Sequence, residues 1–404
     1  MKEMQNGICA AKGFRAAGVW CGIRKNKAKS DLALIVSDVR CTAAGVYTKN
    51  KVKGAPLVVT KQHLADGHAQ AVICNSGNAN TCAPNGMEIA EKTCELAAKA
   101  LGLHSEDIIV GSTGVIGKAM SIEPFASGIP QLVSKLSYNG SAEAGNAIMT
   151  TDLKCKEVAV EFELGGKTCH LGAIAKGSGM IHPNMATMLC FLTTDAAISA
   201  PMLQKALSED ILDSFNQISV DRDTSTNDTV TIMANGLAGN SEITSEGADY
   251  DAFAEALAFI THKMSHLIAS DGEGASKTII CQVCGAPDRQ TARLVSRSVI
   301  SSNLLKAAMF GEDANWGRIL CAIGYTDAEF DISKIDVKLQ SGAGSVWVCE
   351  KAAHHEFSEE EASKVLAAPE ITILVEMHQG EGNATAWGCD LTYDYVKING
   401  DYRT

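Results

Sequence analysis

The stretch that decides the fold is Lys176-Gly-Ser-Gly-Met-Ile-His-Pro-Asn-Met-Ala-Thr-Met-Leu-Cys-Phe-Leu-Thr-Thr-Asp. Its first half is rich in turn formers, which supply unusual backbone dihedral angles. From Thr187 to Thr194 it is apolar and partly β-branched, which predicts a buried strand. A hydroxyl residue therefore stands where a tight turn enters a core strand. Such a residue can attack the carbonyl before it, and after cleavage its own α-amine can serve as the base for its hydroxyl.

A lone threonine at the start of a strand is ordinarily a structural hydroxyl, so a catalytic role needs more than position. The runs Lys176-Gly-Ser-Gly-Met-Ile and Pro183-Asn-Met-Ala-Thr-Met-Leu closely resemble the signature of the ornithine acetyltransferase (glutamate N-acetyltransferase) family. The resemblance implies self-cleavage between Ala186 and Thr187. Thr187 would then be the nucleophile that carries the acyl group.

The composition restricts the class of protein. The chain has 404 residues, of which 46% are hydrophobic, enough for a substantial core. Its net charge of −12 argues against a nucleic acid or an anionic membrane as partner. No apolar run approaches the ~20 residues of a membrane span, and residues 1–19 contain no continuous apolar signal core. We therefore expect a cytoplasmic protein.

The 14 cysteines are scattered along the chain, which does not suggest a disulfide framework. Several stand in apolar, strand-like runs, and we expect these to be reduced thiols of the core. They are Cys74, Cys190, Cys281 and Cys321.

The hydrophobic patterning predicts alternating strands and helices, which is compatible with an α/β fold. The predicted strands lie at 8–23, 32–38, 45–50, 55–60, 71–74, 107–110, 156–175 (a hairpin turning at Gly165-Gly166), 187–194, 229–234, 278–283, 335–350, 371–377 and 384–399. The predicted helices lie at 87–101, 121–136, 250–269, 301–310 and 358–367, with two more that begin after Ser199 and near Asp313.

The family resemblance makes the expected fold more specific. It implies an α/β (α+β) protein with stacked sheets between helix layers (αββα) and a smaller α/β domain at about residues 281–380. It also implies an α-chain of residues 1–186 and a β-chain of residues 187–404 that intertwine and assemble as an α2β2 tetramer.

A second stretch of interest is Gly111-Ser-Thr-Gly-Val-Ile-Gly, which follows a predicted buried strand. A turn bracketed by glycines can direct consecutive backbone N–H groups at one point, as an oxyanion hole requires. A phosphate-binding loop is disfavoured, because Ala119 follows Lys118 where that motif needs serine or threonine. The resemblance implies that Thr113 and Gly114 form the oxyanion hole.

The resemblance also implies a set of residues that hold the substrate. They are Thr150, Lys176, Thr187, Glu273, Asn399 and Thr404. A lysine for a carboxylate and a glutamate for an ammonium would suit an amino acid. Taken alone, Thr150 could equally be a turn or capping residue, and Glu273 an ordinary loop residue.

Three sequence patterns resemble metal-binding motifs, but each lacks residues that the motif requires. Residues 221–228 lack the glycine and the final glutamate of a calcium loop. His262 and His266 have helical spacing, but Lys263 stands where a zinc protease motif has glutamate. Residues 281–284 form a single CxxC without a second pair. We expect neither a metal nor an organic cofactor.

The implied activity is acetyl transfer from N2-acetylornithine to L-glutamate through an acetyl-threonine intermediate, with acetyl-CoA as a further candidate donor. Two alternatives stay open. One is an aminopeptidase or amidase of related fold, in which water takes the acyl group. The other is an uncleaved amino-acid-binding protein, which would remain a single chain.

Overall fold

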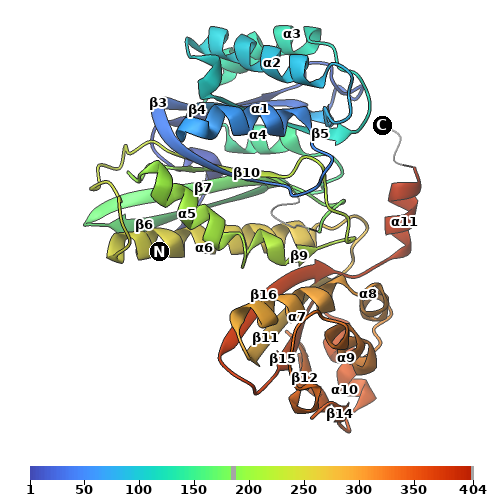
Figure 1. Ribbon diagram of the computed structural model, residues 1–404. Coiled ribbons are helices and arrows are strands. Elements are labelled where there is room, and N and C mark those ends of the chain that lie inside the picture. Colours follow the sequence, from blue (N-terminus) through green and yellow to red (C-terminus); the bar gives the residue numbers. More distant parts are fainter. Residues whose placement is uncertain (183–187, 402–404) are drawn as a thin grey trace.

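The computed structural model describes residues 1–182 and 188–401, and within them the strands form two sheets (Figure 1). The strands of the larger sheet are β1 (Lys2–Met4), β2 (Phe14–Val19), β3 (Leu32–Tyr47), β4 (His68–Asn78), β5 (Ile108–Val115), β6 (Lys156–Leu164), β7 (Lys167–Lys176), β8 (Leu189–Thr194) and β10 (Thr229–Ala234). They are ordered β1-β6-β7-β8-β10-β3-β4-β5, and β2 pairs with β3.

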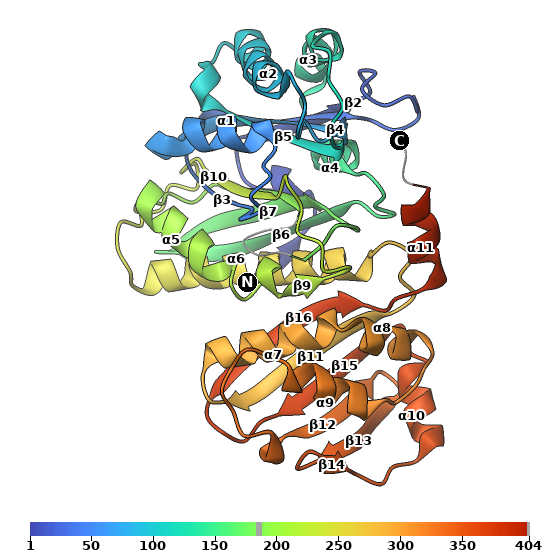
Figure 2. The ribbon, with the colours of Figure 1, turned by 45° about the vertical axis from the view of Figure 1, so that its right-hand side comes forward.

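The larger sheet folds back so that its two halves lie face to face (Figures 1 and 2). The long strand β3 connects the halves: its first part pairs with β2 and β4, and its last part pairs with β10. The β3–β4 register shifts between Val36 and Cys41, and such an irregularity lets a strand bend. The two stacked layers are thus halves of one continuous sheet.

Helices cover both outer faces of this folded sheet (Figure 1). One outer face carries α1 (Ala55–His63), α2 (Gly86–Leu101) and α3 (Glu123–Lys135), and the other carries α5 (Ala200–Asp210) and α6 (Ala248–Ser270). The short helix α4 (Ser141–Ile148) packs into the inner core beside Phe14 and Phe191. The predicted class, α/β with sheets between helix layers, is confirmed.

The smaller sheet, with its own core, makes the smaller C-terminal α/β domain (Figure 2). Its strands are β9 (Ile218–Ser219), β11 (Thr278–Ala286), β12 (Asp336–Ser341), β13 (Gly344–Glu350), β14 (Ala353–His354), β15 (Glu370–Glu376) and β16 (Gly382–Cys389). Its helices are α7 (Arg289–Ser301), α8 (Asn303–Phe310), α9 (Trp316–Gly324) and α10 (Glu359–Leu366), and α11 (Tyr393–Gly400) follows the last strand. Trp387 of β16 packs in the core shared with α6, which ties the two domains together.

The predicted strand at 55–60 is wrong, because these residues begin helix α1. Val58 and Val59 favour a strand by intrinsic preference, but that preference is weak and packing overrides it. Pro56 stands in the first helical turn, where its fixed φ and missing N–H are tolerated. Val59 is buried in the core between this helix and the sheet.

Two other predictions need correction. The predicted strand at 384–399 ends at Cys389, and residues 393–400 form α11, whose side chains are not buried. The glycine-rich segment at 111–117 is not wholly a turn, because β5 continues to Val115 beside β4.

The cysteine prediction holds in part. All 14 cysteines are free thiols, and Cys74, Cys190 and Cys281 are buried as expected, whereas Cys321 is exposed on α9. Among the described residues, no helix combines the length and the apolar composition that crossing a membrane requires.

Candidate active site

A small pocket opens where β7 ends and where β8 and β10 begin. Its lining combines one cation, one carboxyl group, several hydroxyl and amide groups, and apolar side chains. The lining residues are Thr113, Lys176, Gly179, Met180, Ile181, Met188, Leu189, Ser225, Asn227 and Asp228. The pocket therefore contains two predicted site residues, Thr113 and Lys176, that lie 63 positions apart in the sequence.

The predicted oxyanion residues stand at the end of β5, where it pairs with β4. Thr113 is buried and lies opposite Ser76, and Gly114 lies opposite Gly77. Gly114 has φ +130°, and a Cβ there would approach the backbone of Gly77 to 2.3 Å. Only glycine fits this conformation and this contact. The backbone at the end of β5 is thus fixed at the point where the prediction places backbone donors.

Lys176 is the last residue of β7 and pairs with Leu189, the first residue of β8. Its side chain is buried, and within the described residues no hydrogen bond or ion pair engages its Nζ atom. Its positive charge acts on the nearby carboxyl groups of Asp152 and Asp228, and a buried ammonium at the pocket also attracts an anionic ligand. This placement suits the predicted contact with a substrate carboxylate.

A second buried lysine, Lys156, forms the centre of an ion-pair network with Asp152 and Asp271. Its Nζ donates to Asp152 at 2.8 Å and to Asp271 at 2.6 Å, and all three side chains are at most 4% exposed. Burial opposes ionisation of Asp152, but the charges of Lys176 and Lys156 outweigh it and hold the pKa of that carboxyl below its usual range. The Asp152 carboxyl is therefore held in its ionised form.

This network holds three segments that carry predicted site residues. Asp152 accepts the backbone N–H of Thr150 at 2.9 Å and that of Gly177, next to Lys176, at 2.7 Å. Asp271 lies two positions before Glu273. The ion-pair network of Lys156, Asp152 and Asp271 therefore positions the segments that contain Thr150, Lys176 and Glu273.

The side chain of Glu273 is next to the pocket, because it packs against the lining residue Gly179. A Cβ on Gly179 would approach the Glu273 carboxylate to 2.2 Å, so the carboxylate lies against this lining residue. The backbone N–H of Glu273 also donates to the carbonyl of Ser178 at 2.8 Å. On its other side, the Glu273 Oε2 atom accepts a hydrogen bond from Asn399 Nδ2 of α11 at 2.7 Å. The structure thus brings Glu273 and Asn399 together.

Asp221 fixes the loop that precedes residue 183. Its carboxylate accepts the backbone N–H groups of Met180 at 2.6 Å and of Ile181 at 2.8 Å. Met180 has φ +58°, a left-handed conformation that is uncommon for a residue with a side chain. The two hydrogen bonds compensate for that strain and keep the lining residues in place.

The remaining predicted site residues, Ala186, Thr187 and Thr404, lie outside the described residues. Met188, which follows Thr187 in the chain, lines the pocket, and its carbonyl accepts the N–H of Thr229 at 2.9 Å. The pocket therefore adjoins the point where the predicted β-chain begins.

The whole sequence is similar to known proteins. The sequence model of the ArgJ family matches residues 15–404. The chain belongs to the ArgJ family. It is 50% identical to "Arginine biosynthesis bifunctional protein ArgJ 1" of Clostridium acetobutylicum over 392 residues, which cover 97% of this chain and 96% of the relative. It is also 50% identical to the ArgJ protein of Symbiobacterium thermophilum over 406 residues, which cover 100% of both chains.

Two solved ArgJ-type chains are also similar to it. The ArgJ protein of Bacillus halodurans is 45% identical, with a TM-score of 0.49, and the match covers 52% of this chain and 97% of that one. An ornithine acetyltransferase of Mycobacterium tuberculosis, solved with ornithine, is 38% identical, with a TM-score of 0.43, and the match covers 46% of this chain and 99% of that one.

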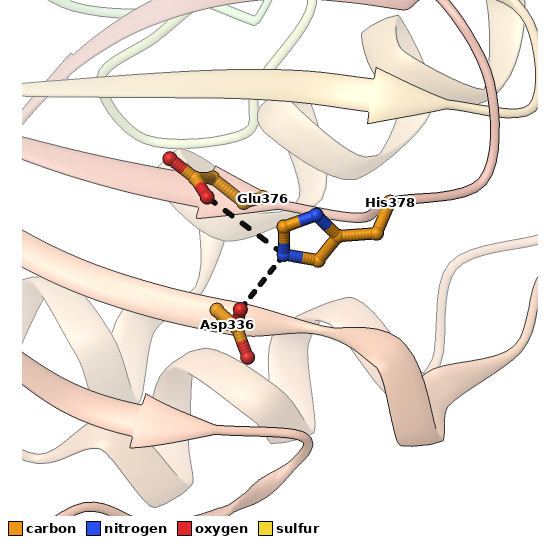
Figure 3. A group of neighbouring side chains, drawn as sticks. All are labelled: Asp336, Glu376 and His378. Atoms are coloured by element: carbon orange, nitrogen blue, oxygen red, sulfur yellow. Dashed lines mark hydrogen bonds and ion pairs between the residues drawn. The ribbon is translucent and has the colours of Figure 1, made fainter.

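This ArgJ-family chain also has a polar cluster outside the pocket, where β12 begins and the neighbouring strand β15 ends (Figure 3). Asp336 and Glu376 lie opposite each other on β12 and β15, and two like charges so placed repel. His378 Nε2 lies 2.7 Å from Asp336 and 3.7 Å from Glu376. The contact between His378 and Asp336 thus lies within the cluster itself.

Sequence patterns missed several residues of the site. Lys156, Asp152 and Asp271 carry no motif, and only the fold shows that they meet. The sequence places Asp228 only in the calcium-loop-like pattern at 221–228, and nothing in that pattern indicates the pocket that Asp228 lines. The signal available for Asp228 was its position directly before the predicted strand at 229–234.

Proposed function

We propose that this member of the ArgJ family is a self-cleaving acetyltransferase that moves acetyl from N2-acetylornithine to L-glutamate. The observation that carries the proposal is the pocket beside Met188, which Thr113 and the buried lysine Lys176 line together. The full-length relatives, named as arginine biosynthesis proteins, support the same pathway.

The proposed reaction uses Thr187 as the nucleophile. Cleavage after Ala186 would free the α-amine of Thr187, whose ordinary pKa of about 8 makes it a usable base near neutral pH. The hydroxyl attacks the acetyl carbonyl, ornithine leaves, and the acetyl ester on Thr187 waits for the amine of glutamate. Thr113 and Gly114 would donate to the oxyanion that develops in each step.

The substrate contacts follow from charge. We assign Lys176 to a substrate carboxylate, because it is a buried cation at the pocket. Glu273 is assigned to a substrate ammonium, with Asn399 holding its carboxylate in place. Thr150, Thr187 and Thr404 complete the proposed substrate-binding set.

The proposal includes the assembly. The precursor would yield an α-chain of residues 1–186 and a β-chain of residues 187–404, which contains the smaller domain at about 281–380. Two of each chain would form an α2β2 tetramer in the cytoplasm. The chemistry needs no metal or organic cofactor, since the residues supply the nucleophile, the base and the oxyanion donors.

The test is a transfer assay with purified protein. With acetylornithine and glutamate we expect ornithine and N-acetylglutamate in equal amounts, and double-reciprocal plots at several glutamate concentrations should be parallel. Replacing acetylornithine by acetyl-CoA decides whether it is a second donor. Release of free acetate at the same rate without glutamate would instead identify a hydrolase, and intersecting lines would indicate direct transfer.

A further inference from the structure

The polar run at residues 221–228 ends in a carboxyl group that the proposed transfer reaction does not use. Asp228 is 1% exposed and lines the pocket, and its Oδ2 atom has no hydrogen-bond partner among residues 1–182 and 188–401. Buried polar atoms without a partner are rare and costly. An unpartnered carboxyl oxygen at a reaction pocket therefore suggests a proton donor or acceptor in the chemistry.

The surroundings of Asp228 shift the pKa of its carboxyl group. Burial raises the pKa of the Asp228 carboxyl well above its usual range, and the hydroxyls of Ser225 and Thr48 and the charge of Lys176 partly offset this. The charge that acts on Asp228 from strand β7 is that of Lys176. A carboxyl of raised pKa is a stronger base when ionised and a usable acid near neutral pH.

The strand register places Asp228 beside the start of the predicted β-chain. β8 and β10 run parallel, and Leu189 pairs with Thr229. Asp228 and Met188 directly precede this pair, and both line the pocket. The residue bonded to the nitrogen of Met188 is Thr187, so Asp228 belongs to the same end of the sheet as the proposed cleavage point.

Self-cleavage has a requirement that the transfer reaction does not have. Before the chain is cut, the nitrogen of Thr187 is an amide and cannot act as a base. Another group must take the proton of the attacking hydroxyl. Resting on the proposed function, we infer that Asp228 is the acid–base residue of self-cleavage.

The proton balance of the step is complete. The Asp228 carboxylate takes the proton of the Thr187 hydroxyl as its oxygen bonds to the carbonyl carbon of Ala186. The carboxyl then returns this proton to the amide nitrogen as the C–N bond breaks, which leaves an ester and a free amine. Water hydrolyses the ester and restores the Thr187 hydroxyl, with a carboxylate on Ala186.

The test follows cleavage of the full-length chain in Asp228→Asn, which keeps the shape of the side chain and removes its ionisation. The precursor is made by cell-free translation at a series of pH values, and the two fragments are quantified over time. We expect cleavage to slow by at least about 100-fold, the usual contribution of acid–base catalysis. We also expect the wild-type rate to rise with pH as the carboxyl ionises, and the variant to lose this dependence.

Asp210→Asn is the matched control. Burial raises the pKa of Asp210 to about 7, but this carboxyl does not line the pocket, so we expect the wild-type rate. If Asp228→Asn cleaves as fast as wild type, or more slowly with an unchanged pH profile, the inference is wrong although self-cleavage stands. An uncleaved wild-type chain would overturn the proposed function and this inference together.

Discussion

Thr187→Ala is expected to remain a single chain of 404 residues and to transfer no acetyl group. The substitution removes the hydroxyl that would attack the preceding carbonyl, so the chain cannot divide. It also removes the group that would carry the acetyl ester, so the loss of transfer should approach the background rate. Intact-mass measurement and the transfer assay on the same sample check both effects.

Thr187→Ser is the matched control, because it keeps a hydroxyl at the same position. We expect it to divide at the same bond and to retain transfer, with an altered rate. If Thr187→Ala divides normally between residues 186 and 187, the hydroxyl is not the cleaving nucleophile. If it divides and also transfers acetyl, the proposed role of Thr187 is wrong.

Lys156→Met is expected to have the largest effect on stability. It leaves the buried carboxylates Asp152 and Asp271 without their shared cation, and breaking a buried ion pair in this way costs about 3–5 kcal/mol of the free energy of unfolding. Because the same network positions Thr150 and Glu273, transfer should also fall, by up to about 100-fold. Urea unfolding of the variant and the wild type measures the first effect.

Lys154→Met provides the control, since Lys154 is exposed two positions away and should change stability by less than about 0.5 kcal/mol. The pH dependence adds a second check. The lowered pKa of Asp152 means that its contribution is present above the ordinary aspartate pKa, about 3.9, and is lost as the pH falls. The gap between Lys156→Met and wild type should therefore narrow in acid, and equal stability at neutral pH would contradict the account.

Much of the fold can be predicted where local pattern and packing agree. The hairpin at 156–175 turns at Gly165-Gly166 as expected, and the helix expected at 87–101 is α2. Prediction failed where packing overrides preference, as in the valine-rich start of α1. It also failed for α7, which was not predicted although Asp288 caps it by accepting the N–H of Thr291.

Some residues of the site could be predicted from the sequence and others could not, for similar reasons. A continuous signature of adjacent residues suggested Thr187 and Lys176, because their chemistry is concentrated in one stretch. Lys156 and Asp271 are 115 positions apart, and no local pattern connects them. The pocket role of Asp228 likewise depends on the parallel pairing of β8 with β10, which topology and not composition determines.

The central claim is that the chain beginning at residue 187 carries the acetyl group. The most direct test supplies purified protein with acetylornithine alone, quenches it in acid, and measures the intact mass of each chain. The account predicts that the chain of residues 187–404 gains the mass of one acetyl group and loses it when glutamate is added. If both chains keep their masses while the same sample transfers acetyl to glutamate, the acetyl-threonine intermediate does not exist.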